Sequence, residues 1–343
     1  MRAYTVSDFD YPLPAHLIAQ RPLPERSASR LLVLHRDTGR IEHRHFRDFP
    51  TLVAPGDVLV VNASRVIPAR LIGRRDNGRP AELLLVHPER EGTWIAMAHP
   101  GGKLKAGRAI RFDGGSTATI EAVLGGGLRR VRFQGPLDVH TLMQRHGTVP
   151  LPPYITRQPD DSDRERYQTM FARVNGSVAA PTAGLHFTPE IVKEITARGG
   201  TIAEIVLHVG PGTFKPVETD DPAQHRMHAE WYELPPEAAA AVNRAKANAA
   251  RVWAIGTTAA RVLEAAAEPR PVRPGSGWTD LFIRPPYDFK IVDALLTNFH
   301  LPRSTLLMLV AAFAGLERTL AAYGEAVARE YRFYSYGDAM AVV

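Results

Sequence analysis

Residues 189–208 read Pro189-Glu-Ile-Val-Lys-Glu-Ile-Thr-Ala-Arg198-Gly-Gly-Thr201-Ile-Ala-Glu-Ile-Val-Leu-His208. This stretch predicts a helix over Pro189–Arg198 and then a strand over Thr201–His208. The same order recurs downstream, with a long alanine-rich helix over Pro235–Ala250 and a strand over Arg251–Ile255. Alternation of this kind predicts an α/β layer with a partly parallel sheet.

The layer extends on both sides of this stretch. Pro55-Gly56-Asp57 introduces a strand over Val58–Asn62, and Ser304 can cap a helix that ends at Gly315. The other elements expected downstream are helices over Thr258–Ala267, Thr305–Ala314 and Leu316–Glu330 and a strand over Ile291–Leu296.

The sequence pattern changes between Arg65 and Gly135, where short β-rich runs alternate with glycines and charged residues. The runs are Ala69–Arg74, Ala81–His87, Thr93–His99, Ala109–Phe112, Thr117–Val123 and Leu128–Phe133. Short strands at this spacing, without a helical period, indicate a small antiparallel barrel or sandwich. We therefore predict an α/β fold: a discontinuous α/β layered domain of residues 1–62 and 148–343, with residues 63–147 inserted as an antiparallel β-barrel domain.

The composition excludes several classes of chemistry. The 343 residues contain no cysteine, which rules out disulfides, thiolate catalysis, iron–sulfur clusters and cysteine zinc sites. The net charge of +6 is compatible with a nucleic-acid partner but is weak evidence alone. The segment Met1–Asp8 has no apolar signal core, and the longest apolar run, Leu306–Ala314, is too short to cross a bilayer. We expect a soluble cytoplasmic protein that does not bind membranes.

Three loops place one histidine each among small residues, glycine or proline. They are Ala179–Thr188 with His186, Leu207–Phe214 with His208, and Thr297–Ser304 with His300. Histidine is the side chain that changes charge nearest neutral pH, and glycine lets a backbone approach a ligand closely. These loops predict one pocket built at strand ends.

Two glycine-containing segments follow predicted strands directly. They are His208-Val-Gly210-Pro-Gly212-Thr213 and Gly256-Thr257-Thr258. Open α/β sheets bind ligands beyond the carboxyl ends of their strands, and a helix N-terminus favours an anion such as a carboxylate or phosphate. The alternative for Thr258 is that it only caps the helix.

The segment His225-Arg-Met-His228-Ala-Glu230 has the residue types of a metal site. Flanking Asp220-Asp-Pro222 and Glu233-Leu-Pro235 favour a loop instead, and no second ligand cluster of familiar spacing exists. Acid–base or substrate-positioning work is the preferred interpretation, and exposed loop histidines are the other alternative.

Basic and polar segments have two interpretations each. Tyr331–Asp338 interleaves aromatics with arginine, which suits either base stacking or a half-buried strand. The polar run Arg157–Arg164 is expected to be a mobile loop. Two arginine clusters are explained by surface solvation unless a polyanion binds: Arg21, Arg26 and Arg30, and Arg70, Arg74, Arg75 and Arg79. No dinucleotide, P-loop, serine-hydrolase or zincin motif is present, so the residues alone indicate an α/β enzyme with a histidine-rich pocket.

The motifs of the chain resemble those of the S-adenosylmethionine:tRNA ribosyltransferase-isomerase family of queuosine biosynthesis. The strongest parts are Val178–Thr188, Leu207–Val217, Met227–Glu230, Gly256–Thr258, Asp293–Ser304 and Tyr331–Met340. Further matching segments are Asp8–Leu13, Ser29–Leu34, Pro55–Asn62, Val66–Leu71, Pro150–Ile155 and Asp163–Thr169. Together they cover the chain in order, which is far more specific than any single short pattern.

The resemblance implies a reaction and its partners. The ribosyl part of S-adenosylmethionine would be joined to 7-aminomethyl-7-deazaguanine in the anticodon wobble position of tRNA. Adenine and methionine would leave while the ribose becomes an epoxycyclopentane, giving epoxyqueuosine. S-adenosylmethionine is then a consumed co-substrate, no metal or other cofactor is expected, and the protein should act as a monomer. The family fold is an α/β domain with an inserted β-barrel.

The resemblance also suggests roles for individual residues. The candidates for the general base that removes the acidified C5′ proton are His186, His208 and His228, with Glu230 as orienting carboxylate or alternative base and Asp338 as a possible acid toward adenine. The residues expected to bind substrates are Arg65, Arg70, Thr182, Gly210, Gly212, Thr213, Thr257, Thr258, Asn298, His300, Arg303, Arg332 and Tyr336.

Some positions depart from the family pattern. Ala63 stands where a polar residue is usual, Arg284-Pro-Pro-Tyr287 replaces a glycine-containing turn, and Ala259-Ala260 replaces Ser-Val. These departures bear on the identity of the acceptor. Three rivals are considered: ribosyl transfer to another acceptor such as a free deazapurine, a tRNA-binding homologue without catalysis, and an ordinary methyltransferase.

Overall fold

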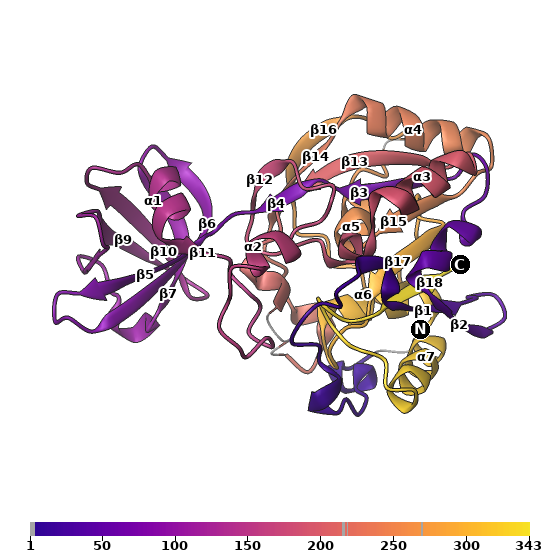
Figure 1. The fold of residues 1–343 in the computed structure, drawn as a ribbon, viewed down its shortest axis with the longest axis horizontal. Helices are drawn as coiled ribbons and strands as arrows, with labels where there is room; N and C mark the ends of the chain where they lie inside the picture. The colour runs from indigo at the N-terminus through magenta and orange to yellow at the C-terminus, as the bar shows by residue number, and fades with distance from the viewer. Residues whose placement is uncertain (1–3, 215–216, 218, 269) are drawn as a thin grey trace.

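The computed structural model describes residues 4–214, 217, 219–268 and 270–343, which form two lobes, an α/β domain and a β-barrel (Figure 1). The strands of the α/β domain are β1 (Arg30–Leu34), β2 (Ile41–His45), β3 (Val58–Asn62), β13 (Thr201–Leu207), β14 (Glu230–Leu234), β15 (Val252–Ile255), β16 (Gly275–Thr279), β17 (Ala294–Asn298) and β18 (Ala339–Val342). Over the described residues, these nine strands make one mixed sheet in the order β16-β14-β13-β3-β15-β17-β18-β1-β2. The predicted α/β layer is confirmed.

The centre of the sheet is parallel. Strand β3 pairs in parallel with β13 and with β15, and β15 pairs in parallel with β17. Every residue of β3, β15 and β17 is buried, as expected for strands covered on both faces. Because these strands run the same way, the loops that follow them, including His208 after β13 and Gly256 after β15, lie at one edge of the sheet.

Helices cover both faces of this sheet. They are α3 (Pro189–Ala197), α4 (Pro236–Ala247), α5 (Thr257–Ala265), α6 (Thr305–Ala314) and α7 (Leu316–Ala328). Val58 and Val60 of β3 share a core with α4 to α7, whereas Leu59 and Val61 belong to the core formed with α3. By length and composition no single helix in the described part could cross a membrane; α6 and α7 pass only as a pair, and that pair is bent by 115°.

The second lobe is a closed antiparallel barrel. Its strands are β5 (Arg70–Arg75), β6 (Pro80–Arg90), β7 (Thr93–His99), β8 (Ala109–Arg111), β9 (Thr117–Gly125) and β10 (Leu128–Gln134). They pair in the order β5-β6-β7-β10-β9-β8, and β8 pairs back to β5, which closes the barrel. Strand β11 (Gly147–Thr148) adds to β5, and α1 (Val139–His146) packs its apolar side into the barrel core. The six predicted strands are confirmed; helix α1 was not predicted.

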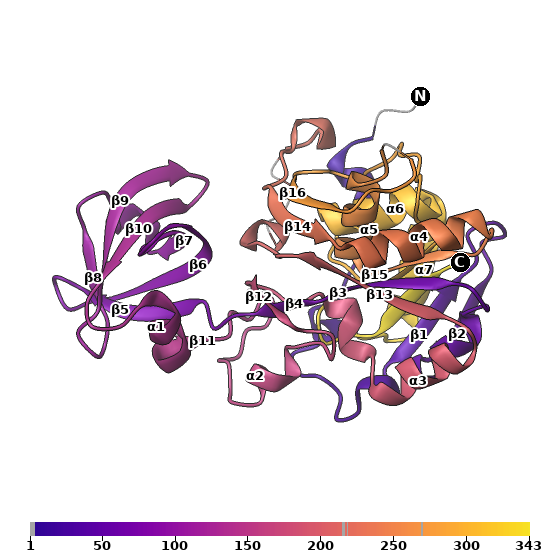
Figure 2. The same cartoon turned by 90° about the horizontal axis from the view of Figure 1, so that it is seen from above.

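The two lobes are linked by a small element of their own. Strand β4 (Ser64–Val66) pairs in parallel with β12 (Val174–Ser177), next to the short helix α2 (Asp163–Arg166). Figures 1 and 2 show this element between the barrel and the large sheet. The chain therefore enters and leaves the barrel through one narrow region, with the barrel strands confined to Arg70–Thr148.

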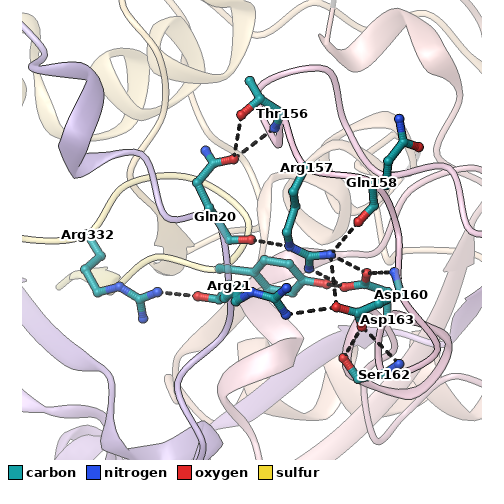
Figure 3. A network of polar contacts seen from close by, with 10 residues as sticks. Gln20, Arg21, Thr156, Arg157, Gln158, Asp160, Ser162, Asp163 and Arg332 are labelled. Atoms are coloured by element: carbon teal, nitrogen blue, oxygen red, sulfur yellow. Dashed lines mark hydrogen bonds and ion pairs between the residues drawn. The ribbon is translucent and has the colours of Figure 1, made fainter.

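The polar segment Arg157–Arg164 is held by a network of charged and polar groups (Figure 3). The Arg157 guanidinium donates to both oxygens of Asp163 at 2.7 and 2.6 Å, and its Nε donates to the Gln20 carbonyl at 2.9 Å. Asp163 is buried and also accepts a hydrogen bond from the Tyr336 hydroxyl at 2.9 Å. Arg157 and Asp163 therefore anchor the segment to other parts of the chain, while Asp160, Asp161 and Arg164 remain exposed.

The interpretation of Tyr331–Asp338 as a half-buried strand is wrong. The strand in this region, β18, begins only at Ala339. Tyr331, Phe333, Tyr334 and Tyr336 are all buried, so they do not offer an open stacking surface either. Tyr331 and Phe333 belong to the core that α6 and α7 share, and Tyr336 packs in a separate cluster with Tyr167, because core packing outweighs local pattern.

Candidate active site

A large cavity lies between the two lobes. It has a volume of about 620 Å³, within the range of pockets that enclose a small-molecule ligand. The barrel lobe contributes His87 and Trp94, and the α/β domain contributes His208, Glu230 and Trp278. Because its wall needs both lobes, the inserted barrel completes a pocket at the carboxyl edge of the sheet.

His208 is held flat between a tryptophan and a glycine. Its ring stacks on Trp231 with centroids 5.2 Å apart and planes inclined by 21°. On the other side lies Gly176, where a Cβ atom would come within 2.5 Å of the imidazole Cε1. Gly176 also has φ of 153°, so a side chain there is excluded both by space and by backbone conformation. This sandwich fixes the plane of the ring.

A chain of hydroxyl groups fixes the protonation of His208. The Val209 N–H donates to the Ser177 Oγ at 2.9 Å, the two serine hydroxyls of Ser177 and Ser64 lie 2.7 Å apart, and Ser64 Oγ lies 2.8 Å from His208 Nδ1. Both serines are fully buried. Every hydroxyl hydrogen finds an acceptor only if Ser177 donates to Ser64 and Ser64 donates to Nδ1. The imidazole then carries its proton on Nε2.

Burial also favours the neutral form of the His208 ring. Desolvation lowers the pKa of His208 from its ordinary value. Protonation of Nδ1 would also reverse the serine chain and leave the buried Ser177 hydroxyl hydrogen without an acceptor among the described residues. His208 therefore faces the cavity as a neutral ring whose Nε2–H is a hydrogen-bond donor.

Glu230 is the carboxylate that lines this cavity, as the only acidic side chain in its described wall. Its Oε1 accepts the Gly210 N–H at 2.7 Å, and its Oε2 pairs with the Arg261 guanidinium. Both side chains of the pair are buried, at 4% and 5% exposure. Arg261 Nε is in turn held by the Leu281 carbonyl at 3.0 Å. The carboxylate is fixed as a charged hydrogen-bond acceptor.

Tryptophans form the apolar walls, which the sequence interpretation missed. Of the four tryptophans, all in the described part, three line the cavity: Trp94, Trp231 and Trp278. Trp278 is 56% exposed and meets His87 of the barrel edge-on, with centroids 5.4 Å apart. A large exposed aromatic at a cavity mouth suits stacking of a planar base. The only signal in the sequence was a tryptophan isolated in the segment Gly275-Ser-Gly-Trp278.

A second, smaller cavity of about 50 Å³ collects five of the predicted residues. They are Thr182, Thr257, Thr258, Asn298 and His300. Val209 borders this cavity and also the large one, so the two are neighbours. Among the predicted residues, the large cavity receives Arg65, His208, Gly210 and Glu230.

His186 and His300 are buried histidines with partners inside the protein. His186 Nδ1 lies 2.7 Å from Ser29 Oγ, its Nε2 accepts from Asn298 Nδ2 at 3.1 Å, and its ring stacks on Phe46. His300 Nε2 lies 2.8 Å from the Thr297 hydroxyl. Burial lowers the pKa of each to about 3. Both rings therefore stay neutral at the pH where His208 would act.

Acidification should destabilise the protein through these two rings. Each has a folded pKa of about 3 against an ordinary value of 6.5, so the unfolded chain binds protons that the folded chain does not. This contribution is fully present above pH 6.5 and is lost as the pH falls toward 3, by about 2 kcal/mol per histidine at about pH 5. Urea unfolding from about pH 8 to 5 should show that the free energy of unfolding falls less in His186→Gln and in His300→Gln than in wild type. Equal decreases in all three proteins would contradict the prediction.

Asp338, Arg332 and Tyr336 serve the backbone and the network of Figure 3. Asp338 is buried, accepts the N–H groups of Arg30 at 2.9 Å and Arg332 at 2.8 Å, and pairs with the Arg30 side chain. The Arg332 guanidinium donates to the Arg21 carbonyl (Figure 3). None of the three lines the large cavity as described.

Arg70, Gly212, His228 and Arg303 are outside the described wall of the large cavity. Arg70 pairs with Glu82 on the barrel, and Arg303 pairs with Asp10 at the surface. His228 packs across Gly212, where a Cβ would come within 2.4 Å of its Cδ2. The side chain of Thr213 lies outside the described residues. Of the departures from the family pattern, Ala63 is buried and lies outside the described wall of the large cavity, as do Pro285 and Pro286.

No metal cluster accompanies the His225–Glu230 segment in the described chain, where no group of three or more histidine or acidic side chains is arranged to hold an ion. Glu230 instead faces Arg261 and the Gly210 N–H.

Comparison with known proteins covers nearly the whole chain. Residues 6–342 match the family described as queuosine biosynthesis protein. A protein of Symbiobacterium thermophilum named S-adenosylmethionine:tRNA ribosyltransferase-isomerase is 52% identical over 98% of this chain and 99% of its own length. A protein of the same name from Thermotoga maritima is 49% identical over 98% and 99% of the two chains. The crystal structure of the S-adenosylmethionine tRNA ribosyltransferase from Thermotoga maritima matches with a TM-score of 0.57 and 40% identity, over 98% of this chain and 100% of that one.

Proposed function

The chain belongs to the queuosine biosynthesis protein family and is a transferase-isomerase enzyme, and from this premise we propose the reaction it carries out. It transfers the ribosyl part of S-adenosylmethionine to 7-aminomethyl-7-deazaguanine at the tRNA wobble position and isomerises it, giving epoxyqueuosine, adenine and methionine. The observation that carries this proposal is the 620 Å³ cavity between the lobes, which joins His208, Glu230 and tryptophan walls in a chain of this family. S-adenosylmethionine is consumed, no resident cofactor takes part, and the enzyme works on tRNA as a cytoplasmic monomer.

The geometry supports a division of labour around the ribose. The Nε2–H of His208 donates a hydrogen bond to a ring nitrogen of adenine, which makes the departing base less basic and its exit from C1′ easier. The fixed carboxylate of Glu230 accepts from a ribose hydroxyl and orients the sugar, as acidic residues do in nucleotide sites. Glu230 is also the acceptor that this cavity offers to the C5′ hydrogen acidified by the sulfonium.

The acceptor base enters past Trp278, and arginines near the mouth meet the phosphates. Arg65 and Arg164 line the same cavity and are exposed. Arginine forks suit phosphate oxygens, and an exposed tryptophan suits a base turned out of its stack. Phosphate contacts at Arg303 and Arg332, two of the residues expected to bind substrates, are less favoured, because their guanidinium groups already have partners at Asp10 and Arg21.

Trp278→Ala should weaken tRNA binding by about 1–3 kcal/mol, the usual effect of losing one base-stacking partner. Trp278→Phe keeps a stacking face and should retain most of the affinity. Fluorescence anisotropy with labelled anticodon stem-loop at fixed salt measures both. S-adenosylmethionine affinity should not change, so an equal loss for both substrates would contradict a role confined to the acceptor.

A product assay tests the proposed reaction. Purified protein is mixed with S-adenosylmethionine and tRNA that carries 7-aminomethyl-7-deazaguanine, small products are separated by chromatography, and tRNA nucleosides are identified by mass spectrometry. Adenine, methionine and epoxyqueuosine together support the proposal. S-adenosylhomocysteine would indicate a methyltransferase, adenine release with the free deazapurine alone another acceptor, and binding without adenine release a non-catalytic homologue.

A further inference from the structure

We propose that the N-terminus of α5 binds the α-amino-carboxylate end of S-adenosylmethionine, and after reaction the same end of product methionine. This inference rests on the proposed function for the identity of the ligand. The site is the small cavity of about 50 Å³ that borders the large one at Val209. Its ligand class, a zwitterionic amino acid, follows from the unpaired groups in its wall.

The backbone supplies the anion-binding half. Helix α5 starts after Gly256, whose φ of 95° is favourable only for glycine, and its first internal hydrogen bond runs from the Ala260 N–H to the Gly256 carbonyl at 3.2 Å. The N–H groups of Thr257, Thr258 and Ala259 precede that bond and have no acceptor in the described chain. Free N–H groups at the positive end of a helix attract a carboxylate.

The buried hydroxyl of Thr258 is a second indication of a bound anion. Thr258 is 8% exposed and lines the cavity, yet its Oγ1 has no hydrogen-bond partner within the described residues. A buried hydroxyl without a partner is costly, which argues that a bound molecule supplies the acceptor. The helix start and the Thr258 hydroxyl together offer several donors to one anion. A role for Thr258 as a simple helix cap is not seen, because its side chain makes no capping bond.

Asn298, another residue of the wall, offers an acceptor instead. Asn298 is 2% exposed, and its Oδ1 has no partner among the residues described. The amide orientation is fixed because its Nδ2 lies within reach of three acceptors: His186 Nε2 at 3.1 Å and the carbonyls of Tyr334 and Asp338 at 3.2 and 3.4 Å. An oxyanion such as phosphate would leave Oδ1 unpaired beside negative charge. An ammonium group satisfies it.

The wall of the cavity thus offers donors to a carboxylate and an acceptor to an ammonium group. These two groups together form the head group of an α-amino acid. About 50 Å³ holds three to five water molecules, at roughly 10–15 Å³ each, close to the five non-hydrogen atoms of that head group. From there the methionine chain leads past Val209 to the large cavity with His208 and Glu230. The small cavity anchors the donor while its ribose reacts in the large one.

The test compares ligands and variants by calorimetry, using the whole protein. Thr258→Val keeps the shape of the side chain and removes the hydroxyl. We expect it to weaken S-adenosylmethionine binding by about 10-fold or more, because a hydrogen bond to a charged group is lost, and to leave binding of 5′-methylthioadenosine unchanged. Thr319→Val is the matched control, since its buried hydroxyl already donates to the Gly315 carbonyl at 2.8 Å; it should bind both ligands as wild type does.

A ligand change makes the same test without any variant. Decarboxylated S-adenosylmethionine should bind wild type less tightly than S-adenosylmethionine does, and Thr258→Val should add no further loss for it. Equal affinities of wild type and Thr258→Val for S-adenosylmethionine, or equal affinities of wild type for the two donors, would overturn the site. If the wild-type protein binds neither 5′-methylthioadenosine nor S-adenosylmethionine, the proposed function itself is contradicted.

Discussion

Replacing His208 with alanine should lower the rate of adenine release by about 10²–10³-fold, the effect expected when a preorganised hydrogen-bond donor is removed from a site of developing charge. The fold should survive, because His208 is half-buried and its ring lies against Trp231 and Gly176 at the cavity wall rather than in a core. Single-turnover release of adenine at saturating S-adenosylmethionine and tRNA measures the chemical step. His146→Ala, which removes an exposed histidine outside the cavity wall, is the control.

The serine chain gives a second readout for the same residue. Ser64→Ala removes the donor to Nδ1 and should let the other tautomer of His208 become populated. In ¹⁵N spectra of the imidazole, wild type should show a pyridine-like Nδ1 and a protonated Nε2, and Ser64→Ala should shift both toward an average. A rate in His208→Ala near that of wild type would remove His208 from the reaction, and unchanged tautomers in Ser64→Ala would remove the serine chain.

The barrel and the parallel centre of the large sheet followed from the sequence because their signals are local, whereas β1, β2, β14, β16 and β18 were not predicted. Period-two runs gave each barrel strand within a few residues, and the helix–strand alternation after Pro189 gave the parallel centre of the sheet. Helix α1 was missed because its eight residues lie in a polar segment at the exit of the barrel, where packing on β5 and β11 decides the structure. The half-buried strand, one of the two interpretations of Tyr331–Asp338, is absent for the same reason, since tertiary burial outweighed local pattern.

The site was only partly accessible from the sequence. His186, His208 and His300 sit in loops of similar composition, but only His208 reaches the large cavity. The difference lies in what covers each ring: Phe46 stacks on His186, the Thr297 hydroxyl holds His300, and nothing in a local motif reveals these neighbours. Trp278 comes from a segment without periodicity, so its place opposite His87 depends on the packing of the two lobes. The predicted strand ends were enough to locate the edge of the sheet where the cavity lies. Which residues line the cavity depends on contacts between segments that are distant in the sequence.

Arg261→Met should destabilise the protein by about 3–5 kcal/mol, because it leaves the Glu230 carboxylate buried without its countercharge. Arg303→Met removes an ion pair of the same type at the surface, where side chains are 58% and 37% exposed, and should cost no more than about 1 kcal/mol. Urea unfolding with a constant m-value measures both. Similar costs for the two substitutions would contradict a buried charged pair.

The double replacement separates stability from function. Arg261→Met with Glu230→Gln removes the uncompensated charge and should recover much of the lost stability, since a neutral amide tolerates burial better than a lone carboxylate. Activity should not recover, because the fixed charged acceptor toward the ribose is gone while the Gly210 N–H remains in place. Recovery of both together would mean that Glu230 serves only the fold. Recovery of stability alone would mean that the ion pair serves to hold a charged acceptor in the cavity. The fold itself would then tolerate uncharged side chains at these two positions.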